Sequence, residues 1–173
     1  ATGKRQQITL PDGTLLTLNT DSAVDIQYTN DVRTIVLKRG EVYVDVAPDK
    51  ARPLTVDAGL LKVTALGTEF MVNKHNKAKP SVTVTEHSVK VENTNNSAES
   101  MVVNTGQKAT ILSERNVISL THEVNTEHEK SWLKGKYVFT NQTVEQVISE
   151  LSRYHAGTII IRNEEIRQMT ISG

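Results

Sequence analysis

Short runs in which apolar and polar residues alternate dominate the first two-thirds of the chain. They are rich in valine, isoleucine and threonine, and a period of two is typical of strands with one buried face. Turn-forming residues separate them, as at residues 11–13, 39–40 and 93–100. The pattern predicts an all-β domain over residues 1–120, either a sandwich or an open solenoid-like array of roughly ten strands. The expected strands span residues 7–10, 16–18, 24–28, 34–37, 42–46, 54–56, 70–72, 82–85, 89–91 and 109–112.

The pattern changes after residue 120. Residues 121–136 are polar and lack alternation, so we expect a linker or a short helix there. Residues 137–140 predict a strand, and apolar residues then recur with the spacing of one helix face. Thr143 and Gln146 match a capping box at the start of this helix, and Gly157 suits the position just past its end. The apolar stripe consists of Val144, Val147, Ile148, Leu151 and Tyr154.

Two further strand candidates follow the expected helix. Residues 158–161 form an unbroken apolar run, typical of a strand buried on both faces, and residues 169–172 are the second candidate. Strand, helix and strand in succession predict a partial α/β unit of βαβ type over residues 137–173, with parallel strands as one arrangement. Because so small a unit buries little surface alone, we expect it to lean on the β domain or to continue beyond residue 173.

The stretch VTALGTEFMV, residues 63–72, places a glycine inside an alternating apolar run. Gly67 indicates a bend or bulge where a branched side chain would be strained, with Leu66 and Phe70 directed into the core on either side. A backbone site for an anion at Gly67 and Thr68 is the alternative interpretation.

Composition narrows the classes of partner. The chain has 173 residues, of which 37% are apolar and 23% charged, with 20 Lys+Arg against 20 Asp+Glu. A neutral chain without a basic run lacks the electrostatic attraction that nucleic-acid binding needs, so no nucleic-acid partner is expected. Cysteine is absent, which excludes disulfides and thiolate chemistry. No apolar stretch approaches the roughly 18 residues of a membrane span.

Local motifs of catalysis are missing from the sequence. It contains no G-x-G-x-x-G, G-x-x-x-x-G-K-[ST], G-x-S-x-G or H-E-x-x-H segment. His122 and His128 are six residues apart, so on a helix their imidazoles would point in different directions and could not share a metal ion. His75 and His155 border turns or a helix end and are expected at the surface. We therefore predict a protein that is not an enzyme and has no catalytic, cofactor or metal site.

Five segments occur in an order that is typical of one family. They are LPDGTLLTLNTDS, VLKRGEVYVDVAPDKARPLTVDAG, VTALGTEFMV, VTVTEHSVKV and NTGQKATIL, and they cover most of residues 7–112. Together they resemble the FecR-type periplasmic regulators, which are inner-membrane anti-sigma factors of cell-surface signalling in Gram-negative bacteria. The chain departs from the family at two positions, with His87 in place of the usual glycine and Leu54 where phenylalanine is frequent.

The last segment resembles a second module. WLKGKYVFTNQTVEQVISELSRYHAGTIIIRNEEIRQMTISG is similar to the C-terminal region of FecR-type proteins and to the short N-terminal domain of secretins and TonB-dependent receptors. Val144 replaces the usual leucine, a tolerable change on a buried face. The resemblance divides the chain into residues 1–120, a linker over residues 121–136 and a partial domain over residues 137–173.

The resemblance implies a place in a signalling chain. The chain would be the periplasmic region of a single-pass inner-membrane protein. It would bind the N-terminal signalling domain of a TonB-dependent outer-membrane transporter, as in siderophore and iron uptake. A cytoplasmic segment, absent here, would then act on an extracytoplasmic-function sigma factor and so regulate transcription.

The expected partner-binding residues lie in the last segment of the chain. Unpaired edge strands can accept a strand from another protein, and the apolar helical stripe is the other candidate surface. A non-catalytic periplasmic carbohydrate-binding or scaffold module is the alternative function. The predicted partner-binding residues are Tyr137, Phe139, Val144, Val147, Leu151, Tyr154, Met169 and Ile171.

Overall fold

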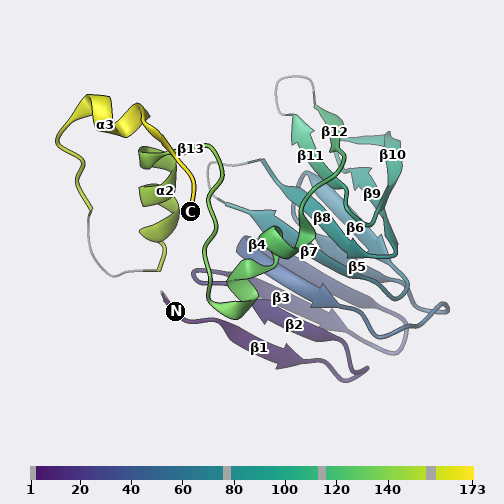
Figure 1. The fold of residues 1–173 in the computed structure, drawn as a ribbon. Helices are drawn as coiled ribbons and strands as arrows, with labels where there is room; N and C mark the ends of the chain where they lie inside the picture. The colour runs from purple at the N-terminus through teal and green to yellow at the C-terminus, as the bar shows by residue number, and fades with distance from the viewer. Residues whose placement is uncertain (1–2, 76–78, 113–115, 155–158) are drawn as a thin grey trace.

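The computed structural model describes residues 3–75, 79–112, 116–154 and 159–173. Residues 6–121 form a twelve-stranded structure, which we call the β-body (Figure 1). The prediction of a mainly β fold is thereby confirmed. Its strands are β1 (Gln6–Thr9), β2 (Leu15–Leu18), β3 (Ala23–Tyr28), β4 (Arg33–Asp45), β5 (Leu54–Asp57), β6 (Leu61–Ala65), β7 (Glu69–Lys74), β8 (Ser81–Glu86), β9 (Ser88–Asn93), β10 (Asn96–Asn104), β11 (Lys108–Leu112) and β12 (Val117–Thr121).

The long strand β4 joins the two halves of the β-body. Before Gly40 it pairs with β3 and, in parallel, with β5, whereas from Gly40 onward it pairs with β2 and β7. Gly40 has a φ of +88°, and a Cβ there would lie 2.3 Å from the Oγ of Ser22. The prediction of a turn at residues 39–40 is therefore wrong, because a glycine in this conformation bends the strand without ending it.

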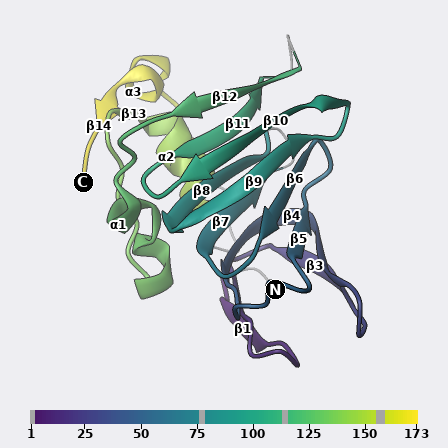
Figure 2. The same ribbon diagram turned by 90° about the vertical axis from the view of Figure 1, so that its right-hand side faces the viewer.

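Apolar side chains from both halves meet inside the β-body. The strand order is β10-β9-β6-β5-β4-β7-β8-β11-β12, and the sheet curls until β10 and β12 come into contact, which leaves it nearly closed (Figure 2). Burial alternates along β2 and β6, as the period-two pattern predicts. Large apolar side chains that are fully buried include Leu16, Ile35, Leu37, Leu54, Leu61, Phe70 and Ile111.

The expected strands omit β6, β10 and β12. β10 begins inside the polar stretch 93–100, which predicted a turn. It pairs with β9 along most of its length, from Ser100 opposite Glu92 to Asn104 opposite Ser88. At its polar start only Asn96 pairs with β9, opposite Asn93, before a register shift that ends at Ser100, so backbone pairing on both sides of the shift holds the strand without apolar alternation.

A buried ion pair ties together two loops at one end of the β-body. The Arg33 side chain is 0% exposed, and its Nη1 lies 2.8 Å from Oδ2 of Asp12 in the loop after β1. Its Nε donates to the carbonyl of Arg52 at 2.6 Å and its Nη1 to the carbonyl of Ala47 at 2.9 Å. The guanidinium thus fixes the loop after β1 against the loop between β4 and β5.

Short helices lead from the β-body to residues 137–173, which we call the C-terminal unit. In Figure 1 this unit stands to the left of the strands. Its helix α2 begins at the predicted capping box, in which Thr143 and Gln146 bond each other's backbone N–H groups. Gly157 lies outside the described residues. The elements after the β-body are α1 (Thr126–Glu129), η1 (Ser131–Lys134), β13 (Gln142–Thr143), α2 (Val144–Leu151), α3 (Glu164–Gln168) and β14 (Thr170–Ile171).

The strands of the C-terminal unit differ from the prediction. Residues 159–161 form no strand, and the Ile160 side chain is 71% exposed. Residues 137–140 form no regular strand either, although Phe139 and Gly173 exchange two backbone hydrogen bonds. β13 and β14 pair antiparallel, so the parallel arrangement is wrong. An apolar run becomes a buried strand only where neighbours cover both of its faces, and this two-stranded sheet covers neither.

Candidate functional site

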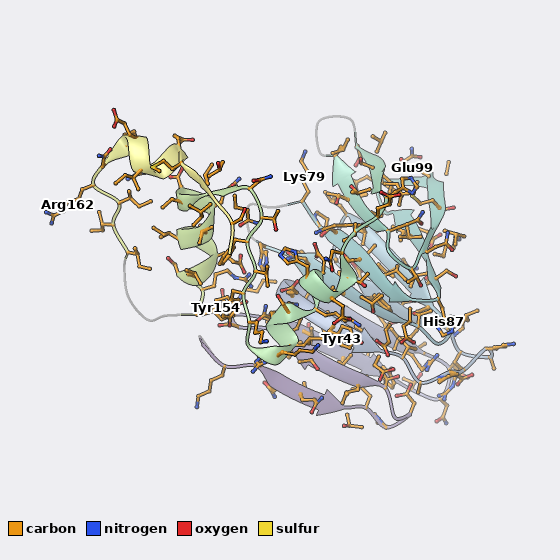
Figure 3. The ribbon with its side chains drawn as sticks, in the orientation of Figure 1. Tyr43, Lys79, His87, Glu99, Tyr154 and Arg162 are labelled. Carbon is orange, nitrogen blue, oxygen red and sulfur yellow. The ribbon has the colours of Figure 1, made fainter. Side chains whose placement is uncertain are left out.

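A polar cleft of about 410 Å³ lies between the β-body and the C-terminal unit. Glu41 of β4 and Asn73 of β7 line it from the β-body. Trp132 of η1, Tyr137 and Tyr154 line it from the other side. Figure 3 shows Tyr154 where α2 approaches the β-body, with Arg162 on the far side of the unit. The cleft therefore combines residues from parts of the chain more than a hundred positions apart.

A hydrogen-bonded chain crosses from the C-terminal unit to the β-body at Tyr154. The side-chain amide of Asn19 donates to the Tyr154 hydroxyl at 2.7 Å and to Oε2 of Glu41 at 2.8 Å. The hydroxyl of Thr20 donates to the carbonyl of Arg153 at 2.9 Å. The turn after β2 thereby holds the end of α2 through side chains of both partners.

Arg153 makes the charged contacts of this junction. Its Nη1 lies 2.8 Å from Oε1 of Glu150 and donates to Nε2 of His75 at 2.8 Å. Its Nη2 donates to the carbonyl of Thr20 at 3.3 Å. His75 was expected at the surface, and the structure places it in this junction because the end of β7 lies beside the residues that follow α2.

Two groups beside the cleft have displaced pKa values. Burial raises the pKa of Glu41 to about 7, against the opposing effect of the Asn19 amide. Burial, followed by the positive charge of Arg153, lowers the pKa of His75 to about 4. Near neutral pH the cleft thus contains a partly protonated carboxyl group beside an uncharged imidazole.

Two residues that line the cleft carry buried polar side-chain atoms that have no hydrogen-bond partner among the described residues. These atoms are Nε1 of Trp132, a residue that is 5% exposed, and Nε2 of His128. Buried polar groups usually have a partner, so these two atoms are unusual for the interior of a protein. Within the described ranges, no cluster of three or more His, Asp or Glu side chains could hold a metal ion.

More than half of the exposed large hydrophobic side chains in the described part of the chain lie in the C-terminal unit. Eleven large hydrophobic side chains are exposed among the described residues, and six of them lie in this short unit. Isolated exposed apolar residues are ordinary, but several on one small unit indicate a contact surface. The six are Val138, Ile159, Ile160, Ile166, Met169 and Ile171.

The predicted partner-binding residues fall into three groups. Met169 and Ile171 are exposed, while Val147 is buried against the rest of the unit. Tyr137, Phe139 and Tyr154 line the cleft, and the rings of Tyr137 and Tyr154 lie with their centroids 4.3 Å apart. The remaining two, Val144 and Leu151, are partly buried on α2.

Comparisons with known proteins give the family. The family model described as "FecR protein" matches residues 1–90, which is more than half of the chain. The chain belongs to the FecR family. No curated protein matches the sequence. Two crystal structures of a candidate anti-sigma factor from Parabacteroides distasonis share the fold at 24% identity, with TM-scores of 0.84 and 0.83, over 99% of this chain and 80% of that chain.

The FecR match covers residues 1–90, and the two crystal structures, at 24% identity, show that the fold is shared along nearly the whole chain. The structure also explains two positions of the FecR pattern. A Cβ at Gly67 would lie 3.1 Å from Cα of Pro48, so the motif glycine lets two loops approach closely. His87 has a φ of +58°, which explains why FecR proteins usually have glycine there.

The sequence led to a wrong expectation for Leu66 and to no expectation for Glu41. Leu66 was expected in the core, but it is 48% exposed because Gly67 turns the backbone between β6 and β7. Glu41 gave no signal, since the sequence shows it as an ordinary carboxylate inside a strand. Only the docking of α2 onto the turn after β2 surrounds Glu41 and shifts its pKa.

None of the helices in the described part of the chain has the length and apolar character of a membrane span.

Proposed function

We propose that this FecR-family chain is the periplasmic region of a single-pass inner-membrane regulator. In this role it binds the N-terminal signalling domain of a TonB-dependent outer-membrane transporter for siderophores. It then relays the occupancy of the transporter to an extracytoplasmic-function sigma factor through a cytoplasmic segment of the parent protein.

The single observation that carries the proposal is the concentration of exposed apolar side chains on the C-terminal unit. A protein partner that covers this surface removes it from water, which provides the main driving force for association. Ile160, at 71% exposure, is the most exposed of the six residues and lies next to Ile159. The partner is therefore expected to contact Ile159 and Ile160, which precede α3.

The open edge of the small β-sheet in the C-terminal unit also favours a partner-binding surface on this unit. β14 pairs with β13 along one edge, and within the described residues no second strand pairs with it. An open edge offers backbone N–H and C=O groups to a strand of another protein. Met169 and Ile171 flank this edge, so their side chains would contact an added strand.

The test is a calorimetric titration of this chain with purified transporter signalling domains, cognate and non-cognate. Ile160→Asp should weaken binding about tenfold or more, because it places a charge in an apolar interface. The matched control is Val102→Asp on β10, where Val102 is also exposed, at 59%, but lies on the β-body.

Thermal unfolding of each variant separates binding from folding. Both variants should melt close to the wild type, since both side chains are already in water. The proposal fails if no signalling domain gives a heat of binding, or if the two substitutions weaken binding equally.

A further inference from the structure

We infer that the cleft between the β-body and the C-terminal unit is a binding site for an alkylammonium group that also carries a hydrogen-bond acceptor. The inference concerns a surface separate from the exposed apolar residues and goes beyond the proposed function. It depends on the charges, the aromatic walls and the two unpartnered atoms of the cleft.

The charge of the cleft favours a cation. Three carboxylates line it, and two of them already have cationic partners, Glu129 with Lys108 at 3.2 Å and Glu150 with Arg153 at 2.8 Å. Glu41 forms no ion pair within the described part of the chain and accepts a hydrogen bond from the neutral amide of Asn19. A bound ammonium would supply the missing positive charge.

The walls of the cleft suit an alkyl chain that ends in a cation. Trp132, Tyr137, Phe139 and Tyr154 line the cleft, and Tyr137 packs against Tyr154. Aromatic faces attract cations and also cover methylene groups. The guanidinium of Arg153, 5.9 Å from the Tyr154 ring centroid, already makes such a contact at the edge of the site.

The unpartnered atoms add a requirement for an acceptor. The indole N–H of Trp132 can only donate, so its missing partner must be an acceptor. A hydroxyl or carbonyl oxygen on the ligand meets this requirement, and a hydroxyl can also donate to Nε2 of His128. A volume of about 410 Å³ accommodates a ligand the size of a short amino alcohol or a lysine side chain.

The test uses three probes of equal length that differ in charge. They are 5-aminopentan-1-ol, the neutral pentane-1,5-diol and the anionic 5-hydroxypentanoate. Trp132 is the single tryptophan of the chain, so its indole N–H gives one NMR signal that reports on the cleft. At about pH 8, where Glu41 is ionised, the amino alcohol should shift this signal saturably with an affinity of about millimolar.

A second arm identifies the source of the ammonium group. Nα-acetyl-lysine amide, whose side-chain ammonium is free, presents the same group as a lysine in a protein. Tighter binding of this probe therefore indicates a lysine of a partner protein. Tighter binding of the amino alcohol indicates a free amine. Either result supports the inference, whereas equal shifts with the diol, or no saturable shift with either ammonium probe, overturn it.

Glu41→Gln should weaken binding of the ammonium probes about tenfold or more while keeping an acceptor for Asn19. The control is Glu92→Gln, which removes a carboxylate paired with Lys90 on β9. Wild-type affinity should also fall about tenfold between about pH 8 and about pH 6, as Glu41 takes up a proton. Unchanged affinity in Glu41→Gln overturns the inference.

Other charged groups around Glu41 are accounted for in the pH series. Arg153 and Glu150 face it from the end of α2, and Glu129 faces it from α1. His75, with a pKa of about 4, stays neutral across the tested range. His128 also lines the cleft, so the series is repeated in His128→Gln, where the pH dependence should persist. If it disappears, Glu41 is not the group that binds the cation.

Discussion

Replacing Asp12 by asparagine would leave the buried guanidinium of Arg33 without its counter-ion. The Arg33 side chain is 0% exposed, that of Asp12 is 10% exposed, and the two charged groups are 2.8 Å apart. The substitution keeps the size of the side chain and changes its charge. It therefore tests how strongly one buried charge depends on its partner.

The expected loss of folding stability follows from the contacts that Arg33 keeps after the substitution. Removal of one partner of a buried ion pair typically costs about 3–5 kcal/mol. Arg33 would keep its hydrogen bonds to the carbonyls of Arg52 and Ala47, so we expect a cost near the lower end, about 3 kcal/mol. This is a large share of the roughly 5–15 kcal/mol that stabilises a typical domain.

Urea unfolding near pH 7, followed by circular dichroism, measures the loss. A cost of about 3 kcal/mol should lower the urea midpoint by about 1–3 M. The matched control is Asp25→Asn, which breaks the exposed pair of Asp25 with Lys38 and should change stability by less than about 1 kcal/mol. Equal losses in the two variants would refute the argument from burial.

Acidification gives a second check on Asp12. Burial acts to raise the pKa of Asp12, but hydrogen bonds from Arg33 and Thr14 outweigh it and hold the pKa below its ordinary value of 3.8. A lowered folded-state pKa means that the stabilisation is present above pH 3.8 and is lost as the pH falls through the folded value. The difference between the wild type and Asp12→Asn should therefore narrow on acidification below pH 3.8.

Three further outcomes are expected. Gly40→Ala should cost about 3 kcal/mol or more in urea unfolding, since its Cβ would meet Ser22, whereas Gly106→Ala, also at positive φ but with open space around it, should cost about 1 kcal/mol. Because the folded-state pKa of Glu41 is raised from 4.5 to about 7, wild-type stability should fall as the pH rises across that range. Glu41→Gln should remove this loss and be more stable at high pH by up to about 3 kcal/mol, and a pH-independent difference between the two proteins would contradict the burial of Glu41. Because Val147 is buried, Val147→Asp should speed hydrogen exchange of the α2 amides about a hundredfold, which corresponds to a loss of about 3 kcal/mol in the free energy of local opening. Exchange in β7 should not change.

The local pattern of apolar and polar residues was sufficient to predict strands and helices that bury one face. The alternating runs predicted most strands of the β-body, and the capping box with its apolar stripe predicted α2 to begin after Thr143. Each of these signals lies within a few residues of the structure that it predicts. They were therefore readable from the chain alone.

Prediction failed where a neighbour in space decides the outcome. Residues 159–161 have the composition of a buried strand, but no strand in the described part of the chain covers them and Ile160 is exposed. β10 is polar at its start, and pairing with β9 at Asn96 and again from Ser100 onward holds it as a strand. In both cases the environment overrides intrinsic preference.

The sequence by itself determined the mainly β fold, the position of the helix and, through its ordered motifs, the FecR family. The tertiary structure alone decided that β4 serves both halves of the β-body, that Arg33 and Asp12 meet in its interior, and that Glu41 faces the end of α2 across a cleft. The physical reason is distance along the chain. Hydrophobic period and capping act between residues a few positions apart, whereas burial, ion pairing and a shifted pKa arise from groups that only folding brings together.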